Sequence, residues 1–126
     1  MKSFDLILIL LSVFLSATAQ LLLKLGASAP AVRDAIAGGG EMSGRAVALM
    51  TSPTLVGGLA IYALSAAFWI AVLSRVDLSL AYPFVGLGFI LTFVIGTVFL
   101  GETANAARLS GTLLIAAGAV LVARSA

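Results

Sequence analysis

Four long stretches of this chain carry no charged side chain, and they constrain the fold more than any other feature. They cover residues 6–23, 46–74, 78–101 and 109–123. A helix needs about 20 apolar residues to cross the roughly 30 Å hydrocarbon core of a bilayer. The sequence therefore predicts an all-α membrane protein with one domain, residues 1–126, and short loops except the first. Its four transmembrane helices are expected at about 6–25, 55–73, 78–101 and 106–123, with the long loop at 26–54.

Composition excludes several classes of function. The chain is 62% hydrophobic and 10% charged, whereas soluble domains average about 25% charged residues. It has no cysteine and no histidine, which excludes disulfides, thiol nucleophiles and zinc sites of the Cys/His kind. A net charge of +2 that is scattered along the chain does not suggest a nucleic-acid surface. No nucleophile–base pair is visible, so we expect no enzyme activity, no cofactor and no metal site.

The first helix and the first loop each leave an alternative open. Lys2, an apolar stretch and Ala-Thr-Ala at 17–19 resemble a cleavable signal peptide. Against this, residues 21–23 continue the apolar run and three more spans follow. In the loop, Ser28 and Pro30 predict a short helix through Ala37, broken by the glycines at 38–40. Residues 45–50 form either a short helix in the membrane interface or a flexible surface loop.

The charges do not fix the orientation of the chain in the membrane. With four spans, three cations fall on one side and four on the other: Lys2, Arg75 and Arg124 against Lys24, Arg33, Arg45 and Arg108. This asymmetry is weak for a rule driven by lysine and arginine. Either another feature sets the orientation, or the chain inserts both ways and forms an antiparallel homodimer.

The first predicted helix has a polar stripe. Ser12, Ser16, Gln20 and Lys24 are spaced by four and therefore share one face, which should avoid lipid. Hydrogen bonds between helices are the favoured role of Ser12 and Ser16. For Gln20 and Lys24, substrate binding and a structural role are equally open. No carboxylate lies deep in any span, which disfavours a proton-coupled antiporter with a central acid.

Lys24, Glu102 and Arg108 are expected at one membrane face. Lys24 ends the first span, Glu102 ends the third span, and Arg108 starts the fourth span. One hypothesis is a Lys24–Glu102 ion pair that fixes packing, with Arg108 as an interfacial anchor. The other is a headgroup site in which Lys24 and Arg108 bind a phosphate.

Aromatic and small residues suggest further features. Trp69 and Tyr82 lie toward the opposite face and are either interfacial aromatics or cavity walls for a lipid-like substrate. Pro83 either kinks the third helix or falls in its first turns without effect. Gly111 and Gly118 lie seven apart on the fourth helix, which indicates either a dimer interface or packing within the chain.

Several of these motifs coincide with a known family. Residues 16–24 (Ser-Ala-Thr-Ala-Gln-Leu-Leu-Leu-Lys), Ala-Tyr-Pro at 81–83, Gly-Glu at 101–102 and the glycine-rich stretch 111–118 carry the resemblance. The chain resembles four-span members of the drug/metabolite transporter superfamily, of the EamA and small multidrug resistance kinds. Among these it is similar to the subunits of the aminoarabinose-phosphoundecaprenol flippase. The resemblance covers all four predicted helices.

The chain departs from the small multidrug resistance exporters at one position. Those exporters carry a membrane-embedded glutamate eight residues before the lysine that ends their first helix, and Ser16 stands there in this chain. The resemblance therefore implies a flippase, or flippase subunit, for a polyprenyl-phosphate-linked sugar in the bacterial cytoplasmic (inner) membrane. Its headgroup site is expected to use Lys24, Gln20, Ser16, Arg108, Glu102, Tyr82 and Trp69.

The implied partners are an anionic polyprenyl-phosphate glycolipid and a second four-span chain, identical or similar. Two other functions stay open. One is an exporter of small organic solutes without a central carboxylate, and the other is an accessory membrane subunit that transports nothing. Transport into vesicles by the purified protein would separate these hypotheses.

Overall fold

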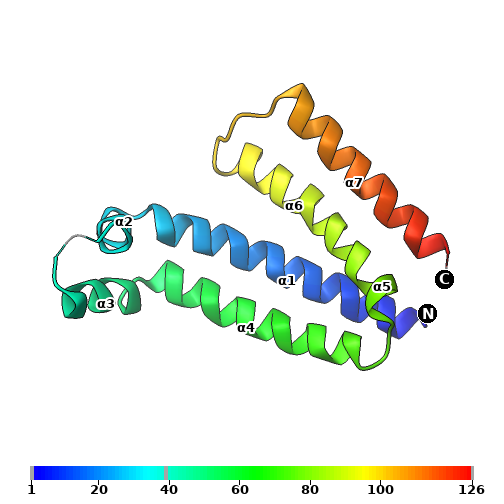
Figure 1. Ribbon diagram of the computed structural model, residues 1–126, viewed down its shortest axis with the longest axis horizontal. Helices are drawn as coiled ribbons and strands as arrows, with labels where there is room; N and C mark the ends of the chain where they lie inside the picture. The colour runs from blue at the N-terminus through cyan, green and yellow to red at the C-terminus, as the bar shows by residue number, and fades with distance from the viewer. Residues whose placement is uncertain (1, 39, 126) are drawn as a thin grey trace.

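The computed structural model describes residues 2–38 and 40–125, and that part of the chain contains helices and loops but no strand (Figure 1). The helices are α1 (Ser3–Ser28), α2 (Pro30–Ile36), α3 (Met42–Met50), α4 (Pro53–Leu73), α5 (Leu78–Ala81), α6 (Val85–Val98) and α7 (Ala106–Arg124), with a 3₁₀ turn η1 at Tyr82–Phe84. Four of the described segments are long and apolar enough to cross a membrane: α1, α4, Leu78–Val98 and α7. The predicted all-α fold with four spanning helices is confirmed.

The ends of the spans follow local chemistry that hydropathy does not register. The third span stops at Val98 rather than near 101, because the chain turns back at Gly101, whose φ is +65°. The Glu102 amide then donates a hydrogen bond to the Gly96 carbonyl over 2.9 Å. Asn105 starts α7 as its N-cap, since its side chain accepts from the Arg108 amide at 2.8 Å.

Pro83 lies inside the third span. Its ring removes one backbone donor, and the chain passes through the 3₁₀ turn η1 between α5 and α6 at this point. The segment Leu78–Val98 nevertheless continues as one membrane-length unit.

The first loop contains two short helices rather than unstructured chain. α2 begins at Pro30, as predicted, and ends at Ile36. Its N-cap is Ala29 rather than Ser28, because Ser28 ends α1 and donates its hydroxyl to the Lys24 carbonyl at 2.7 Å. α3 covers Met42–Met50, so this stretch is helical, and no residue of α3 is buried. The Arg45 guanidinium ties the two helices together, because its Nε donates to the Ala35 carbonyl at 2.7 Å.

The closest packing joins α1 to α4. A Cβ added to Gly26 would lie 2.7 Å from the Leu55 nitrogen, and one added to Gly58 would lie 3.0 Å from the Leu23 nitrogen. Farther along, Ser12 and Ser65 are both buried and hold the helices together by reciprocal hydrogen bonds. Each hydroxyl donates to the other residue's carbonyl, over 3.1 Å and 3.0 Å. These contacts form an α1–α4 hairpin with very little space between its helices.

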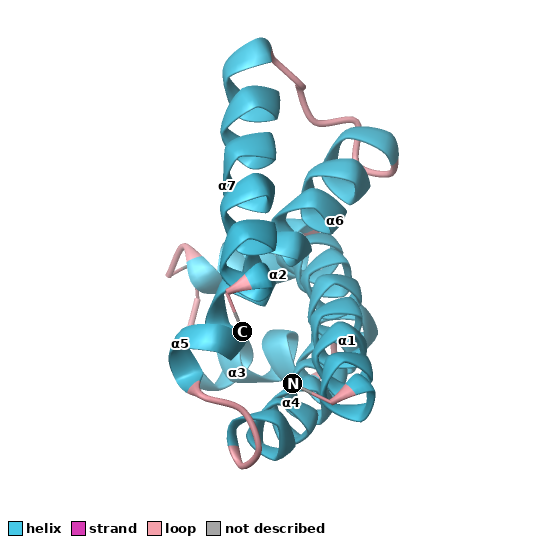
Figure 2. Ribbon diagram, turned by 90° about the vertical axis from the view of Figure 1, so that its right-hand side faces the viewer, coloured by secondary structure: helices cyan, strands magenta, loops and turns pink. Residues whose placement is uncertain are grey.

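The α6–α7 hairpin lies beside the α1–α4 hairpin (Figures 1 and 2). Gly86 allows α6 to approach α7, where its Cβ position is 3.0 Å from Ile115 Cγ2. The two hairpins share a buried apolar cluster at the end that holds the termini, made of Ile9, Val13, Val72, Val76, Ala81 and Phe84. We call this the closed end of the molecule.

An ion pair reinforces the closed end. The Arg75 Nε lies 2.6 Å from the Asp5 carboxylate, and the Arg75 guanidinium lies 5.0 Å from the centre of the Phe4 ring. Asp5 is 5% exposed. Arg75 therefore joins the loop after α4 to the first turn of α1.

Candidate functional site

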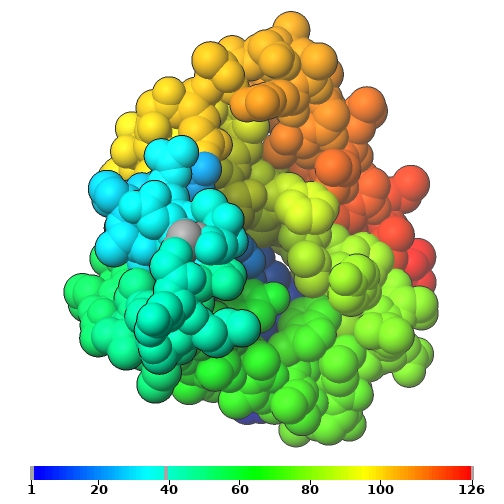
Figure 3. Space-filling model, turned by 60° about the vertical axis from the view of Figure 1, so that its left-hand side comes forward, coloured from blue at the N-terminus to red at the C-terminus, as the bar shows by residue number. Residues whose placement is uncertain are grey.

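A groove of about 620 Å³ separates the two hairpins. Its walls come from α1, α4, η1 and α6 and from the turn after α6, whereas α7 contributes no lining residue among those described. Figure 3 shows the molecule hollowed between the hairpins. The apolar cluster stops the groove at the closed end, and Lys24, Leu100 and Glu102 line it at the opposite end, which we call the mouth.

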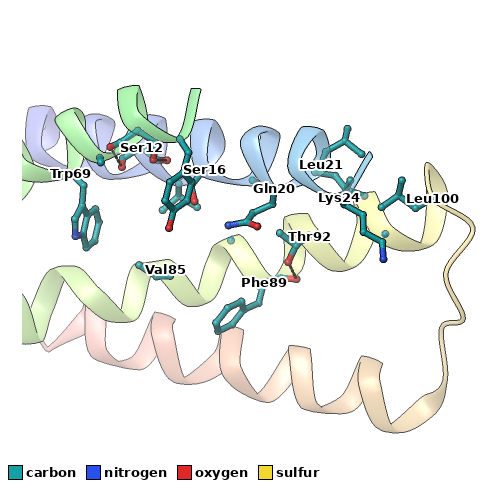
Figure 4. Close-up of a pocket in the computed structure, with 18 of the residues that line it drawn as sticks. Ser12, Ser16, Gln20, Leu21, Lys24, Trp69, Val85, Phe89, Thr92 and Leu100 are labelled. Atoms are coloured by element: carbon teal, nitrogen blue, oxygen red, sulfur yellow. Dashed lines mark hydrogen bonds between the residues drawn. The ribbon is translucent and has the colours of Figure 1, made fainter. Parts of the chain in front are cut away.

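The wall formed by α1 carries one polar side chain in each turn, with apolar side chains between them. Ser12, Ser16, Gln20 and Lys24 all line the groove, and Gln20 and Lys24 extend from α1 toward α6 (Figure 4). Ser12 is engaged with Ser65, which is the helix–helix role predicted for it. Within the described residues, the side chains of Ser16, Gln20 and Lys24 have no hydrogen-bond partner in the protein. These three side chains are therefore available to a molecule in the groove.

Aromatic side chains form the wall nearer the closed end. Trp69 of α4 and Tyr82 of η1 meet edge to face, with ring centres 6.4 Å apart and planes inclined by 67°. Both line the groove, and so do Tyr62 and Phe89. Trp69 and Tyr82 therefore line the groove, and whether they contact a lipid-like substrate stays a prediction. Aromatic faces of this kind suit the C–H face of a sugar or an apolar chain.

The mouth contains two opposite charges, on Lys24 and Glu102, that do not form an ion pair. Lys24 and Glu102 both line the groove, yet the one ion pair among the described residues is Arg75–Asp5, so no Lys24–Glu102 pair forms within 4.0 Å. The Glu102 carboxylate lies against α6 at Gly96, where an added Cβ would be 2.6 Å from its Oε2. The ion-pair hypothesis for Lys24 and Glu102 therefore does not describe this arrangement.

Arg108 is the one predicted headgroup residue that the groove does not include. Its Nη1 donates to the Thr103 carbonyl at 2.9 Å, and the residue does not line the cavity. Arg108 lies in the first turn of α7, after the extended segment that follows Glu102, and its role in headgroup binding stays a prediction.

Sequence reasoning missed part of the site on α4 and α6. Tyr62 was not singled out, although it lies seven residues before Trp69 and therefore on the same helix face. Gly88, Thr92 and Gly96 line the groove at intervals of four. This small and polar stripe on α6 faces the polar stripe on α1, and its spacing was the signal that could have revealed it.

Gly111 and Gly118 lie on α7, away from the groove. A Cβ added to either would meet no atom within 4 Å. Packing within the described chain therefore does not account for these glycines, and their role in a dimer stays a prediction.

Comparison with known proteins identifies the family of the chain. A model of the family described as "Small Multidrug Resistance protein" matches residues 41–115. A protein of Pseudomonas aeruginosa (strain UCBPP-PA14), named probable 4-amino-4-deoxy-L-arabinose-phosphoundecaprenol flippase subunit ArnE, is 40% identical over 58 residues, which are 46% of this chain and 50% of that protein. Its namesake in Pseudomonas paraeruginosa (strain DSM 24068 / PA7) is 36% identical over 63 residues, or 50% of this chain and 55% of the relative.

The chain spans about half the length of the curated relatives that it matches. No solved structure matches it. The family match at 41–115 covers more than half of the 126 residues and includes α4, α6 and much of α7. The chain is a multi-pass membrane protein that belongs to the Small Multidrug Resistance protein family.

Proposed function

We propose that the chain is a flippase, or a flippase subunit, that moves a polyprenyl-phosphate-linked sugar across the bacterial cytoplasmic (inner) membrane. One observation carries the proposal. The groove has a polar wall with a single cation, Lys24, and the walls that α1 and α4 contribute contain no carboxylate. Relatives named as flippase subunits support the same function.

The groove suits the headgroup of such a lipid. A sugar phosphate that crosses the hydrocarbon without partners loses its hydration, which costs several kcal/mol or more for each charged or polar group. The Lys24 ammonium replaces water around the phosphate with charge-assisted hydrogen bonds. Gln20 and Ser16 supply donors and acceptors for sugar hydroxyls, and Trp69 offers an aromatic face. The apolar tail stays in the surrounding lipid.

The same walls disfavour export driven by a central acid. A protonatable carboxylate in the middle of a span is the usual coupling group in proton-driven transporters. Ser16 and Gln20 occupy the middle of the α1 wall, and Glu102 at the mouth is the one carboxylate among the described lining residues. We therefore propose that binding of the anionic lipid, rather than protonation inside the membrane, selects the substrate.

A second four-span chain completes the transporter in this proposal. The relatives are named as subunits, and Gly111 and Gly118 leave a close-approach face open on α7. Helices with small residues on one face associate in membranes because their backbones can approach closely. The partner is a second copy or a similar chain.

Flipping in vesicles tests the proposal. The protein, together with any four-span chain that copurifies with it, is reconstituted with a fluorescent short-chain polyprenyl phosphodiester of a sugar. We expect flipping at least tenfold above protein-free vesicles, a loss of most of it in Lys24→Met, and full activity in Arg33→Gln. Arg33 is the matched control because it is an exposed cation on α2.

Two results would replace the proposal. Movement of small organic solutes without any lipid flipping would identify an exporter. Movement of neither class would identify an accessory subunit.

A further inference from the structure

We infer that Glu102 binds an ammonium group of the transported headgroup, so that the groove prefers a headgroup carrying both a phosphate and an amine. The inference rests on the proposed function and assigns the specificity of the same site. The relatives' printed names contain an amino sugar, but they do not say which residue recognises the amine. The arrangement of charges at the mouth points to Glu102 as the residue that binds the amine.

The backbone places Glu102, an exposed residue, at the mouth of the groove. Gly101 has a φ of +65°, a conformation that L side chains rarely adopt, and it reverses the chain directly after α6. The Glu102 amide then bonds to the Gly96 carbonyl at 2.9 Å. The carboxylate lies on α6 where Gly96 has no side chain, with its Oε2 2.6 Å from the position that a Cβ would take. The carboxylate therefore packs against the backbone of α6 at Gly96.

The carboxylate has no cationic partner among the described residues. Lys24 is the other charged lining residue, but the pair is not within 4.0 Å. Arg108, the nearest cation along the chain, bonds instead to the Thr103 carbonyl. Glu102 is exposed, so a ligand at the mouth can reach its carboxylate, and an anion without a cationic partner favours a ligand that brings a positive charge.

Two separated opposite charges select for a zwitterion. Lys24 attracts the phosphate, but Glu102 repels it, so a ligand with a phosphate alone gains from one residue and loses to the other. A headgroup with an amine pairs with both residues through charge-assisted hydrogen bonds. A neutral sugar leaves Glu102 unpaired. The preference for an amine therefore comes as much from the unpaired Glu102 carboxylate in the other complexes as from the amine–carboxylate contact itself.

Fluorescence of Trp69 can measure this preference. Trp69 is the single tryptophan of the chain and lines the groove. Three short-chain polyprenyl probes are titrated into the complete protein in lipid nanodiscs: the phosphodiester of an amino sugar, its N-acetylated form, and polyprenyl phosphate alone. We expect the amino-sugar probe to bind the wild type about tenfold more tightly than the acetylated probe.

The variants separate the two charges. Glu102→Gln should lower affinity for the amino-sugar probe about tenfold, to the level of the acetylated probe, whose own affinity should not fall. Lys24→Met should weaken both sugar probes by a similar factor and leave their ratio unchanged. Glu41→Gln, an exposed carboxylate outside the groove, should change neither probe. Gly96→Ala retains every charge but displaces the end of the flexible Glu102 side chain, so it should reduce the preference for the amine.

Several outcomes would overturn the inference. A wild type that binds both sugar probes equally would reject it and leave the proposed function standing. Equal losses for both probes in Glu102→Gln would show a purely structural role. If that variant does not fold, the wild-type comparison of the amino-sugar and acetylated probes decides. Binding of none of the three probes by the wild type would reject the proposed function as well.

Discussion

Replacing Gly26 with alanine should destabilise the α1–α4 hairpin although it adds only one methyl group. The added Cβ would lie 2.7 Å from the Leu55 nitrogen and 2.8 Å from the Leu55 Cα. Both atoms belong to the backbone of α4, so no side-chain rotation can relieve the overlap. The helices must separate by about 0.7 Å at this point to reach an ordinary contact of 3.4 Å.

Two opposing contributions set the expected change in the free energy of unfolding. Overpacking of a tight interface costs about 1–3 kcal/mol. Replacing glycine by alanine within a helix returns about 0.5–1 kcal/mol. The two terms together leave a loss of about 0–2.5 kcal/mol, and because the methyl group overlaps backbone atoms we expect the free energy of unfolding to fall by about 1–2 kcal/mol. Gly57 provides the matched control, because a Cβ there would meet nothing within 4 Å, and Gly57→Ala should leave stability unchanged or slightly raise it.

Unfolding by sodium dodecyl sulfate in mixed micelles, followed by circular dichroism, measures both variants against the wild type. We expect a lower midpoint for Gly26→Ala alone. A Gly26→Ala protein as stable as the wild type would refute the close helix approach. Equal destabilisation by Gly57→Ala would show that loss of glycine, rather than the contact with Leu55, causes the effect.

Three further predictions concern the same scaffold. Ser65→Ala should cost about 0.6 kcal/mol and Ser12→Ala with Ser65→Ala about twice that, measured in the same unfolding assay, because each serine donates one interhelical hydrogen bond. Arg75→Gln should lower the thermal midpoint more than Arg75→Gln combined with Asp5→Asn, since the single change strands a buried carboxylate. Gly118→Leu should shift crosslinked protein toward monomer, and a fully dimeric variant would exclude this face of α7.

The spanning helices could be predicted because their cause is local. Uncharged runs identify all four, although the run at 109–123 is shorter than a full span, and a spacing of four places Ser12, Ser16, Gln20 and Lys24 on one face. Neither inference needs contacts between distant parts of the chain. The same patterns could not separate helix–helix bonding from ligand binding, because both use polar residues on an inward face. The Ser12–Ser65 bonds resolve this for Ser12.

Features that depend on backbone turns and distant pairs could not be predicted. The order of the spans predicts that Glu102 and Lys24 lie at the same end of the bundle. The turn at Gly101 and the absence of a side chain at Gly96 direct the Glu102 carboxylate into the groove, and the sequence does not reveal this. The Arg75–Asp5 pair joins residues 70 positions apart. The width of the groove depends on how far the two hairpins diverge, which hydropathy does not encode.

Photocrosslinking in native membranes tests most directly whether a lipid headgroup occupies the groove. A photoreactive amino acid replaces Thr92, which lines the groove on α6, and separately Leu114, which is 73% exposed on α7. Mass spectrometry then identifies the attached lipids. The account predicts a polyprenyl-phosphate glycolipid at position 92 and only bulk phospholipid at position 114, whereas the same lipids at both positions would contradict it.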